Sequence, residues 1–152
     1  MSSPTSTTTI RPARPADANA ITELIAPFAA SGKILPSTPR ELRHLMATGF
    51  VAEQAGRIVG FAALEIYSAK LAEIRSLAVT GEQQRQGVGS QLVAACVDLA
   101  RQRGVLEVMA ITSSEEFFQG CGFDFTLTGE KKALFIQPSS GLPGPSSGSS
   151  PS

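Results

Sequence analysis

A short glycine loop between a strand-like and a helix-like run constrains the fold of this chain more than any other feature. Residues 84–90, Gln-Arg-Gln-Gly-Val-Gly-Ser, follow an apolar run ending at Val79 and lead into a helical pattern from Val88 to Arg103. The first N–H groups of a helix have no partner inside the helix, and the helix dipole adds partial positive charge there. A strand, a glycine loop and a helix start thus present an anion site, which favours a phosphorylated cofactor. Gly-x-Gly before a helix also occurs where the glycines only allow close packing and bind no ligand.

The loop departs from the commoner nucleotide-binding motifs. A Walker loop ends in Gly-Lys-Ser/Thr, whereas here Ser90 follows Gly89 with no lysine between them. The dinucleotide fingerprint needs a third glycine, and position 92 is Leu92. The pattern that fits the loop is Gln/Arg-x-x-Gly-x-Gly.

Composition and charge narrow the class of protein. At 152 residues the chain has the size of one domain. Its 13 basic and 13 acidic residues balance, which argues against broad nucleic-acid or anionic-membrane binding. No apolar run approaches the roughly 20 residues of a membrane span, and the Ser/Thr-rich start lacks the apolar core of a secretory signal. Cys96 and Cys121 lack metal-ligand spacing, so we expect two structural thiols in a cytoplasmic protein without a metal site.

The periodicity of apolar residues predicts an alternation of strands and helices that is not strictly βα. The second helix is marked by a capping box, Thr38-Pro39-Arg40-Glu41. The predicted elements, in chain order, are a strand over 9–13, helices over 15–29 and 39–48, strands over 50–54, 57–66 and 71–79, a helix over 88–103, a strand over 105–111, a helix over 114–120, and strands over 123–127 and 133–136.

The order β-α-α-β-β-β-α-β-α-β-β predicts an α/β fold with a mixed, mostly antiparallel, twisted sheet and helices on both faces. The strand–helix–strand unit from 71 to 111 implies one parallel pair of strands. We expect a flexible N-terminus over 1–8, one folded domain over 9–137, and a disordered tail over 138–152. The tail is almost all Ser, Gly and Pro and too poor in apolar residues to order itself.

Three features together resemble the GCN5-related N-acetyltransferase (GNAT) family. Leu77-Ala78-Val79 followed by the 84–89 loop is similar to the family's central cofactor motif. Residues 117–123, Phe-Phe-Gln-Gly-Cys-Gly-Phe, look like its Phe-Tyr-x-x-x-Gly-Phe segment. The third is the order of elements, which is that of the GNAT fold over about residues 9–137.

Within that family the chain resembles the acetyltransferase domain of N-acetylglutamate synthases. The likeness lies in residues 72–79, Ala-Glu-Ile-Arg-Ser-Leu-Ala-Val, in residues 32–36 before the second helix, and in the Phe-Phe pair. Those enzymes acetylate the α-amine of glutamate, or sometimes glutamine, as the first step toward arginine. The resemblance therefore implies an amino-acid N-acetyltransferase.

The resemblance implies acetyl-CoA as the cofactor. The backbone of Leu77 and Val79 would pair with the pantetheine amides like an extra strand, and the N–H groups of residues 85–90 would hold the pyrophosphate. The side chain of Arg85 either adds a contact or is simply solvated. The predicted cofactor-binding residues are Leu77, Ala78, Val79, Gln84, Arg85, Gln86, Gly87, Val88, Gly89, Ser90, Phe117 and Phe118.

Glu73 is the candidate general base, because the family's proposed base falls on this position. An amino acid at neutral pH carries an ammonium group, which cannot attack until a carboxylate, directly or through a water, takes its proton. If the strand is regular, Glu73, Arg75, Leu77 and Val79 project to one face, so the base and the cofactor grip share a side. The alternative is a surface Glu73–Arg75 ion pair, worth only about 0–1 kcal/mol, which would weaken the base.

Two further positions are assigned to the chemistry by the resemblance. The backbone N–H of Ser76 or Leu77 would stabilise the oxyanion, because such a donor is fixed before the charge develops. Phe118 stands where many family members carry a Tyr that protonates the leaving thiolate. Thr112 matches a hydroxyl position proposed in the glutamate acetylators. A hydroxyl is a poor acid, so Thr112 either hydrogen-bonds the sulfur or caps the short helix that follows.

The predicted acceptor-binding residues depart from the family pattern. Ser37 stands where the glutamate acetylators carry an Arg that grips a carboxylate, and Lys131 or Lys132 aligns with a second Arg. Lys is a point charge without the planar fork of Arg, so glutamate is favoured but less firmly specified. Lys33 or Arg40 could substitute. The predicted set is Leu35, Ser37, Arg75 and Lys131.

His44, the only histidine, is expected to be a packing or surface residue rather than a base. The function expected is direct acetyl transfer from acetyl-CoA to an amino acid in a ternary complex, by a cytoplasmic protein of arginine biosynthesis, as monomer or homodimer. Two alternatives stay open. One is an acetyltransferase for another amine, such as a polyamine or a protein amine. The other is a non-catalytic acyl-CoA-binding module, which the missing Tyr keeps open.

Overall fold

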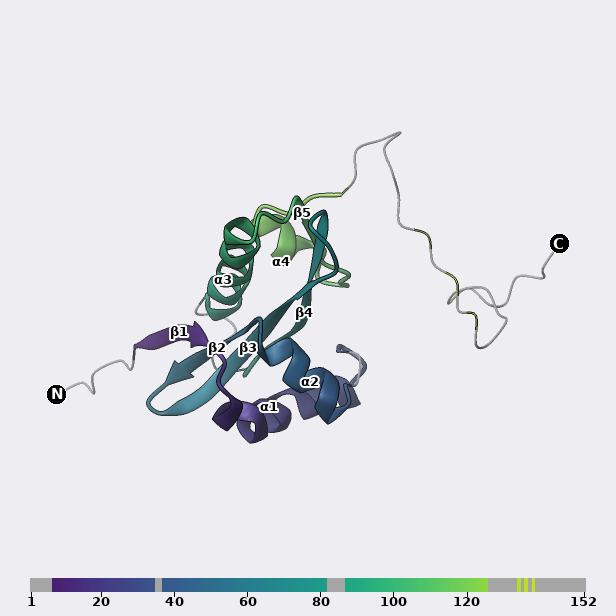
Figure 1. The fold of residues 1–152 in the computed structure, drawn as a ribbon. Coiled ribbons are helices and arrows are strands. Elements are labelled where there is room, and N and C mark those ends of the chain that lie inside the picture. Colours follow the sequence, from purple (N-terminus) through teal and green to yellow (C-terminus); the bar gives the residue numbers. More distant parts are fainter. Residues whose placement is uncertain are drawn as a thin grey trace.

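The computed structural model describes residues 7–34, 37–81 and 87–125, together with positions 134, 136 and 138. These residues form one open sheet with helices on both faces (Figure 1). The elements, in chain order, are β1 (Thr8–Pro12), a short 3₁₀ turn (Pro15–Asp17), α1 (Ala18–Ala30), α2 (Pro39–Met46), β2 (Gly49–Gln54), β3 (Arg57–Ile66), β4 (Leu71–Val79), α3 (Val88–Gln102), β5 (Glu107–Met109) and α4 (Glu115–Gly120).

The strands follow the chain order β1-β2-β3-β4-β5 across the sheet. The first four pair antiparallel, and β5 pairs parallel to β4. The parallel pair is joined by α3, as a parallel connection requires a crossover. The mixed, mostly antiparallel sheet expected from the sequence is therefore confirmed.

Two apolar clusters fill the space between the sheet and its helices. Helices α1 and α2 cover one face, and α3 and α4 cover the other (Figure 1). Ile21 of α1, Leu45 of α2 and Phe61 of β3 centre the first cluster, and Leu92 of α3 with Leu64 of β3 centre the second. Neighbouring residues of β3 thus face opposite layers, as the alternation of a strand requires.

Strand β4 carries a bulge at Ser76 and Leu77. Phe61 pairs with Ala78 and Ala63 pairs with Arg75, so one residue of β3 faces two residues of β4. Ser76 adopts a φ of 58°, a left-handed conformation that is uncommon outside glycine. A bulge reverses the alternation of side chains beyond it. Odd-numbered residues of β4 therefore face the α1–α2 layer before the bulge and the α3–α4 layer after it.

Strand β5 pairs along its whole length with the first three residues of β4. The paired positions are Leu71 with Glu107, Ala72 with Val108 and Glu73 with Met109. Beyond Glu73, β4 has no strand neighbour on that side among the described residues. The backbone N–H and C=O groups along this edge could pair with an extended ligand.

Several predicted boundaries differ from the structure. Strand β1 begins at Thr8, inside the segment predicted to be flexible, and β5 is shorter than the predicted 105–111. The N–H of Val105 instead bonds the carbonyl of Ala100 and closes α3. Phe123 was predicted to begin a strand, but its N–H bonds the carbonyl of Phe118 and closes α4.

The last two predicted strands are described only in part. Phe123–Phe125 of the first, and Leu134 and Ile136 of the second, are not in strands. The remaining residues of both, and residues 139–152 of the predicted tail, lie outside the described residues.

The described part of the chain has neither a membrane-spanning helix nor a cluster of metal-binding side chains. None of its helices is long and apolar enough to cross a membrane. Among these residues, no group of three or more His, Cys, Asp or Glu side chains could hold a metal ion.

Candidate active site

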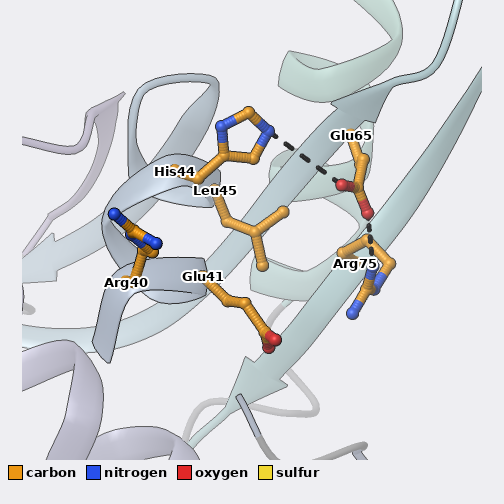
Figure 2. Close-up of a pocket in the computed structure, with 6 residues that line it drawn as sticks. All are labelled: Arg40, Glu41, His44, Leu45, Glu65 and Arg75. Atoms are coloured by element: carbon orange, nitrogen blue, oxygen red, sulfur yellow. Dashed lines mark hydrogen bonds and ion pairs between the residues drawn. The ribbon is translucent and has the colours of Figure 1, made fainter. Parts of the chain in front are cut away.

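A pocket of about 600 Å³ lies between α2 and the paired strands β3 and β4. It is lined by Arg40, Glu41, His44 and Leu45 of α2, and by Glu65 and Arg75 of the strands (Figure 2). The start of α2 is fixed by the predicted capping box. The Thr38 hydroxyl accepts from the N–H of Glu41 at 3.1 Å, and the Glu41 carboxylate accepts from the N–H of Thr38 at 3.3 Å. The capping box fixes where α2 begins and therefore where its pocket-lining side chains lie.

Glu73, the predicted base, is buried beside this pocket. It is 9% exposed and is the only buried charged residue among those described. Glu73 pairs with Glu65 across β3 and β4, so the two carboxylates face the same layer. Like charges directly opposite each other destabilise a sheet unless neighbouring groups compensate.

Tyr67 and Arg75 supply that compensation. The Tyr67 hydroxyl donates to the Glu73 Oε1 at 2.5 Å and lies 3.2 Å from Oε1 of Glu65. Burial, followed by the hydrogen bond to Glu73, raises the pKa of Tyr67 to about 12. The hydroxyl therefore keeps its proton at neutral pH and remains a donor to the buried carboxylate.

Arg75 forms its ion pair with Glu65, the neighbour of Glu73 across the strands (Figure 2). Burial alone would lower the pKa of Arg75, but the charge of Glu65 raises it overall. The alternative of a surface Glu73–Arg75 ion pair is wrong, because Arg75 engages Glu65 and Glu73 is buried. His44 also approaches Glu65, with Nε2 4.0 Å from Oε2 (Figure 2).

The shared face predicted for β4 is also wrong, because the strand is not regular. Glu73 and Arg75 precede the bulge and lie on the α2 side. Leu77 and Val79 follow the bulge and pack in the cluster on the α3 side. The predicted base and the predicted cofactor grip therefore lie on opposite faces of one strand, with Ser76 between them. Ala78, predicted to bind cofactor, is buried against the α1–α2 layer.

The start of α3 combines two glycines with different roles. Gly87 is the N-cap, with a left-handed φ of 77°. Gly89 allows a close approach, because a Cβ there would lie 3.2 Å from the ring of Phe117. Val88 is buried and Ser90 is exposed, with its hydroxyl 3.9 Å from the Cys121 sulfur. The predicted loop residues Gln84, Arg85 and Gln86 lie outside the described residues.

The two predicted aromatic cofactor residues differ in exposure. Phe118 is 7% exposed and belongs to the apolar cluster, with its ring edge-on to Phe117 and Phe123. Phe117 is half-buried and lines a second hollow with Ser113, Ser114, Glu115 and Glu116. Phe117 is thus placed to meet a ligand at the start of α3, whereas Phe118 packs.

Thr112 lies just past β5 and is exposed. Its hydroxyl accepts from the N–H of Ser114 at 2.8 Å, directly before α4. Ser114 is the N-cap of α4 and the helix has no side-chain cap hydrogen bond, so the helix-capping alternative for Thr112 is wrong. The bond to Ser114 leaves the second lone pair and the hydroxyl proton of Thr112 available. Glu73 and Met109 are the last paired residues of β4 and β5. Thr112 lies three residues after Met109 along the chain, and Ser76 lies three residues after Glu73.

The predicted acceptor residues are only partly placed. Arg75 lines the pocket, and Ser37 is half-buried immediately before the cap of α2. Leu35 and Lys131 lie outside the described residues. Sequence reasoning missed Glu65, Tyr67 and the pocket position of His44. Only the register of the hairpin from 57 to 79 would have signalled them, since it places Glu65 opposite Glu73.

The residues present fit coenzyme A. The β4 edge beyond Glu73 offers backbone groups for amide pairing, and the first N–H groups of α3 have no partner inside the helix. Gly87 and Gly89 keep side chains away from those N–H groups. Leu77, Val79 and Val88 pack in the apolar cluster beneath this region, and the Phe117 ring lies next to Gly89.

The chain is similar to known acetyltransferases over most of its length. Residues 19–123 match the family model described as "Acetyltransferase (GNAT) family". The chain is 36% identical over 120 residues to an uncharacterized N-acetyltransferase of Chlorobaculum tepidum, covering 79% of this chain and 77% of that protein. It is 33% identical over 116 residues to an amino-acid acetyltransferase of Neisseria meningitidis, covering 75% of this chain and 27% of that protein.

A solved structure shows the same arrangement of elements. The N-acetylglutamate synthase of Neisseria gonorrhoeae, complexed with coenzyme A and N-acetyl-glutamate, superposes with a TM-score of 0.74 at 30% identity. The match covers 82% of this chain and 30% of that one. The chain thus spans about a quarter to a third of the Neisseria proteins that it matches.

Proposed function

The chain belongs to the acetyltransferase (GNAT) family, and we propose that it acetylates the α-amine of an amino acid, with glutamate favoured. It is an acetyl-CoA-dependent N-acetyltransferase. The observation that carries the acceptor proposal is the mixed charge of the pocket. Two acidic residues, Glu41 and Glu65, and two arginines, Arg40 and Arg75, line it together. A zwitterion, which brings an ammonium and a carboxylate, suits such a lining better than a polyamine does.

Glu73 is the base in this proposal. Its burial and its place next to the pocket put a carboxylate where an acceptor ammonium would lose its proton. Because Tyr67 holds one oxygen, Oε1, the carboxylate has a fixed orientation. Arg75 neutralises Glu65, so of the two facing carboxylates Glu73 is the one without an ion pair among the described contacts.

Acetyl-CoA supplies the thioester carbonyl that the amine attacks and leaves as a thiolate. The bulge carries the proposed oxyanion donor, the backbone N–H of Ser76 or Leu77. Ser76 holds a sparsely populated backbone conformation, which is often found where a site needs a donor aimed in a fixed direction. Thr112 is proposed to hydrogen-bond the sulfur, since its hydroxyl proton is not used by its bond to Ser114.

The acceptor carboxylate is proposed to meet the cations of the pocket. Arg75 uses part of its guanidinium on Glu65, and Arg40 has no hydrogen bond or ion pair among the described contacts. Ser37, Leu35 and Lys131 remain predicted contacts. With glutamate as acceptor, the product N-acetylglutamate would place the reaction in arginine biosynthesis, in the cytoplasm.

A thiol-release assay tests this proposal. The full chain is incubated with acetyl-CoA and one acceptor at a time from glutamate, glutamine, lysine, spermidine and an amino-terminal peptide. We expect thiol release with an α-amino acid, fastest with glutamate. Faster turnover of spermidine or peptide would contradict the amino-acid acceptor. Coenzyme A binding without any turnover would indicate the non-catalytic module.

A further inference from the structure

We propose that the proton taken up by Glu73 leaves the site through the hydroxyl of Tyr67, then Glu65, and then the imidazole of His44. The proposal rests on the proposed function and assigns it a proton-exit route. None of these three relay residues was predicted from the sequence to take part in the chemistry. Tyr67 would act as a positioning residue that also carries the proton.

Glu73 needs such a route because it is buried. Each turnover moves one proton from the acceptor ammonium to a Glu73 oxygen. The carboxylate must lose that proton before the next acceptor can be activated. At 9% exposure, Glu73 has little direct access to water. The only hydrogen bond that the described contacts give its side chain is that from Tyr67.

Two hydrogen bonds and one longer ion-pair contact lead from Glu73 to the pocket rim. The Tyr67 hydroxyl lies 2.5 Å from Oε1 of Glu73 and 3.2 Å from Oε1 of Glu65. The other oxygen of Glu65, Oε2, lies 4.0 Å from Nε2 of His44. The path ends in solvent, because the His44 side chain is 74% exposed (Figure 2).

The proton balance closes over one turnover. Glu73 gives its proton to the Tyr67 oxygen while Tyr67 gives its own proton to Glu65. Tyr67 delivers the proton to Oε1 of Glu65, whereas Oε2 is the oxygen nearer His44, so the neutral carboxyl group rotates to turn its O–H toward Nε2. Nε2 takes the proton, Glu65 returns to the carboxylate, and the imidazolium releases the proton to water. No bond other than O–H and N–H changes, and every group returns to its starting state.

The charges around the path support transfer rather than storage of the proton. Arg75 of β4 faces Glu65 and Tyr67, and Arg40 and Glu41 of α2 line the same pocket. The ion pair with Arg75 holds the Glu65 carboxylate between Tyr67 and His44. Tyr67 stays protonated at neutral pH, since its pKa is raised to about 12. Histidine is the side chain that ordinarily exchanges protons near neutral pH.

The link between Tyr67 and Glu73 can be measured without cofactor. Tyr67 is the only tyrosine and the chain has no tryptophan, so tyrosinate absorbance reports Tyr67 alone. We expect a midpoint near 12 in the native protein and a clearly lower one in Glu73→Gln, because removing the negative charge favours the phenolate. Glu107→Gln, on the exposed start of β5, is the matched control and should leave the midpoint in place. Equal midpoints in native protein and Glu73→Gln would overturn the path.

Kinetics test the path itself. Tyr67→Phe keeps the ring and loses the hydroxyl, so we expect kcat to fall about 10- to 100-fold, with coenzyme A affinity unchanged. His44→Ala should lower kcat in dilute buffer, and added imidazole should restore it. Thr22→Val, which removes a hydroxyl bonded only to the Ala18 carbonyl, is the control.

The two proposals fail differently. Native kcat in both Tyr67→Phe and His44→Ala, with no effect of imidazole, would overturn the relay and leave the acetyl transfer standing. Absence of any turnover by the native chain would overturn the proposed function, while the tyrosinate titration would still test the Tyr67–Glu73 link.

Discussion

Glu65 and Glu73 stand directly opposite each other on neighbouring strands, a pairing that costs stability in an ordinary sheet. Arg75 neutralises the first carboxylate, and the Tyr67 hydroxyl satisfies the second. One acid is thus tied up in an ion pair, while the other is buried with only a hydrogen bond. Two carboxylates in different surroundings are suited to different roles, and we assign base chemistry to the one without an ion pair.

Cys121 offers a residue-scale test of the cofactor site. Its sulfur is 3.9 Å from the Ser90 hydroxyl at the start of α3, whereas Cys96 is buried and its pKa is raised to about 12 by burial. We expect a thiol reagent to modify Cys121 in the native protein and to spare Cys96.

Coenzyme A should slow the modification of Cys121, because the nucleotide would cover the start of α3. Peptide mass mapping after timed alkylation, with and without coenzyme A, measures this protection. Equal rates at Cys121 in both samples would argue against a cofactor at this helix end, and Cys96 serves as the internal control.

At the scale of elements, the β4 bulge is what joins the two halves of the site. It turns Glu73 toward α2 and Leu77 toward α3, so the acceptor pocket and the cofactor edge approach one strand from opposite faces. A regular strand would have placed both on one side, as the sequence pattern predicted. Apolar periodicity cannot reveal this bulge, because Ser76 is not a glycine and the three residues after it, 77–79, are all apolar and so fit either register.

The N-cap of α3 gives an element-scale prediction about backbone conformation. Gly87→Ala should lower stability by about 1–2 kcal/mol, because φ is 77° there and no neighbouring atom would gain a contact. It should also weaken coenzyme A binding, since the cap orients the first N–H groups of α3.

Gly81→Ala is the matched control, because its φ is not in the left-handed region and nothing lies within 4 Å of the added Cβ. Thermal unfolding and coenzyme A titration of both variants make the comparison. Equal behaviour of the two variants would mean that the conformation of Gly87 does not shape this helix end.

A partly buried ion pair connects β1 to the turn before α1. Arg11 contacts Asp17 at 2.8 Å, with side chains 13% and 11% exposed, and also reaches Glu53 of β2. The hydrogen bond from Arg11 holds the pKa of Asp17 below its ordinary 3.8. Asp17→Asn should therefore cost about 3 kcal/mol at neutral pH, because Arg11 loses its main partner.

The sign of the pH dependence follows from that lowered pKa. The stabilisation by Asp17 is present above pH 3.8 and is lost as pH falls below it, so native protein and Asp17→Asn should converge in acid. Denaturant unfolding at several pH values measures the difference. Asp98→Asn breaks an exposed pair with Arg101 and should cost about 0–1 kcal/mol. A pH-independent gap for Asp17→Asn would refute the account.

At the scale of the whole molecule, the sheet separates two working faces. Helices α2 and α3 lie on opposite faces of the sheet (Figure 1). The α2 side carries the mixed-charge pocket, and the α3 side carries the glycine-capped helix end and Phe117. The faces meet where β4 and β5 part beyond Glu73 and Met109. A thioester lying along that edge would be reached by an amine from the pocket, which is the geometry of direct transfer.

The sequence predicted the elements from β1 to α4, but not the network around Glu73. Turn and capping residues are local signals, so Thr38-Pro39-Arg40-Glu41 and Ala55-Gly56 located a helix start and a hairpin correctly. Tyr67, Glu65 and His44 come together only through strand register and the packing of α2 on β3. Those are tertiary properties, and no local pattern encodes them. Leu35, Lys131 and the 84–86 loop remain predictions.

The most direct test of the central claim is the kcat of Glu73→Gln with the best acceptor, measured beside its coenzyme A affinity. We predict a loss of about 10²- to 10⁴-fold in kcat with native coenzyme A affinity, because only the proton acceptor is removed. Glu107→Gln, an exposed substitution on β5, should keep native kcat. Native turnover by Glu73→Gln would contradict the assignment of Glu73 as the base, and with it this account of the site.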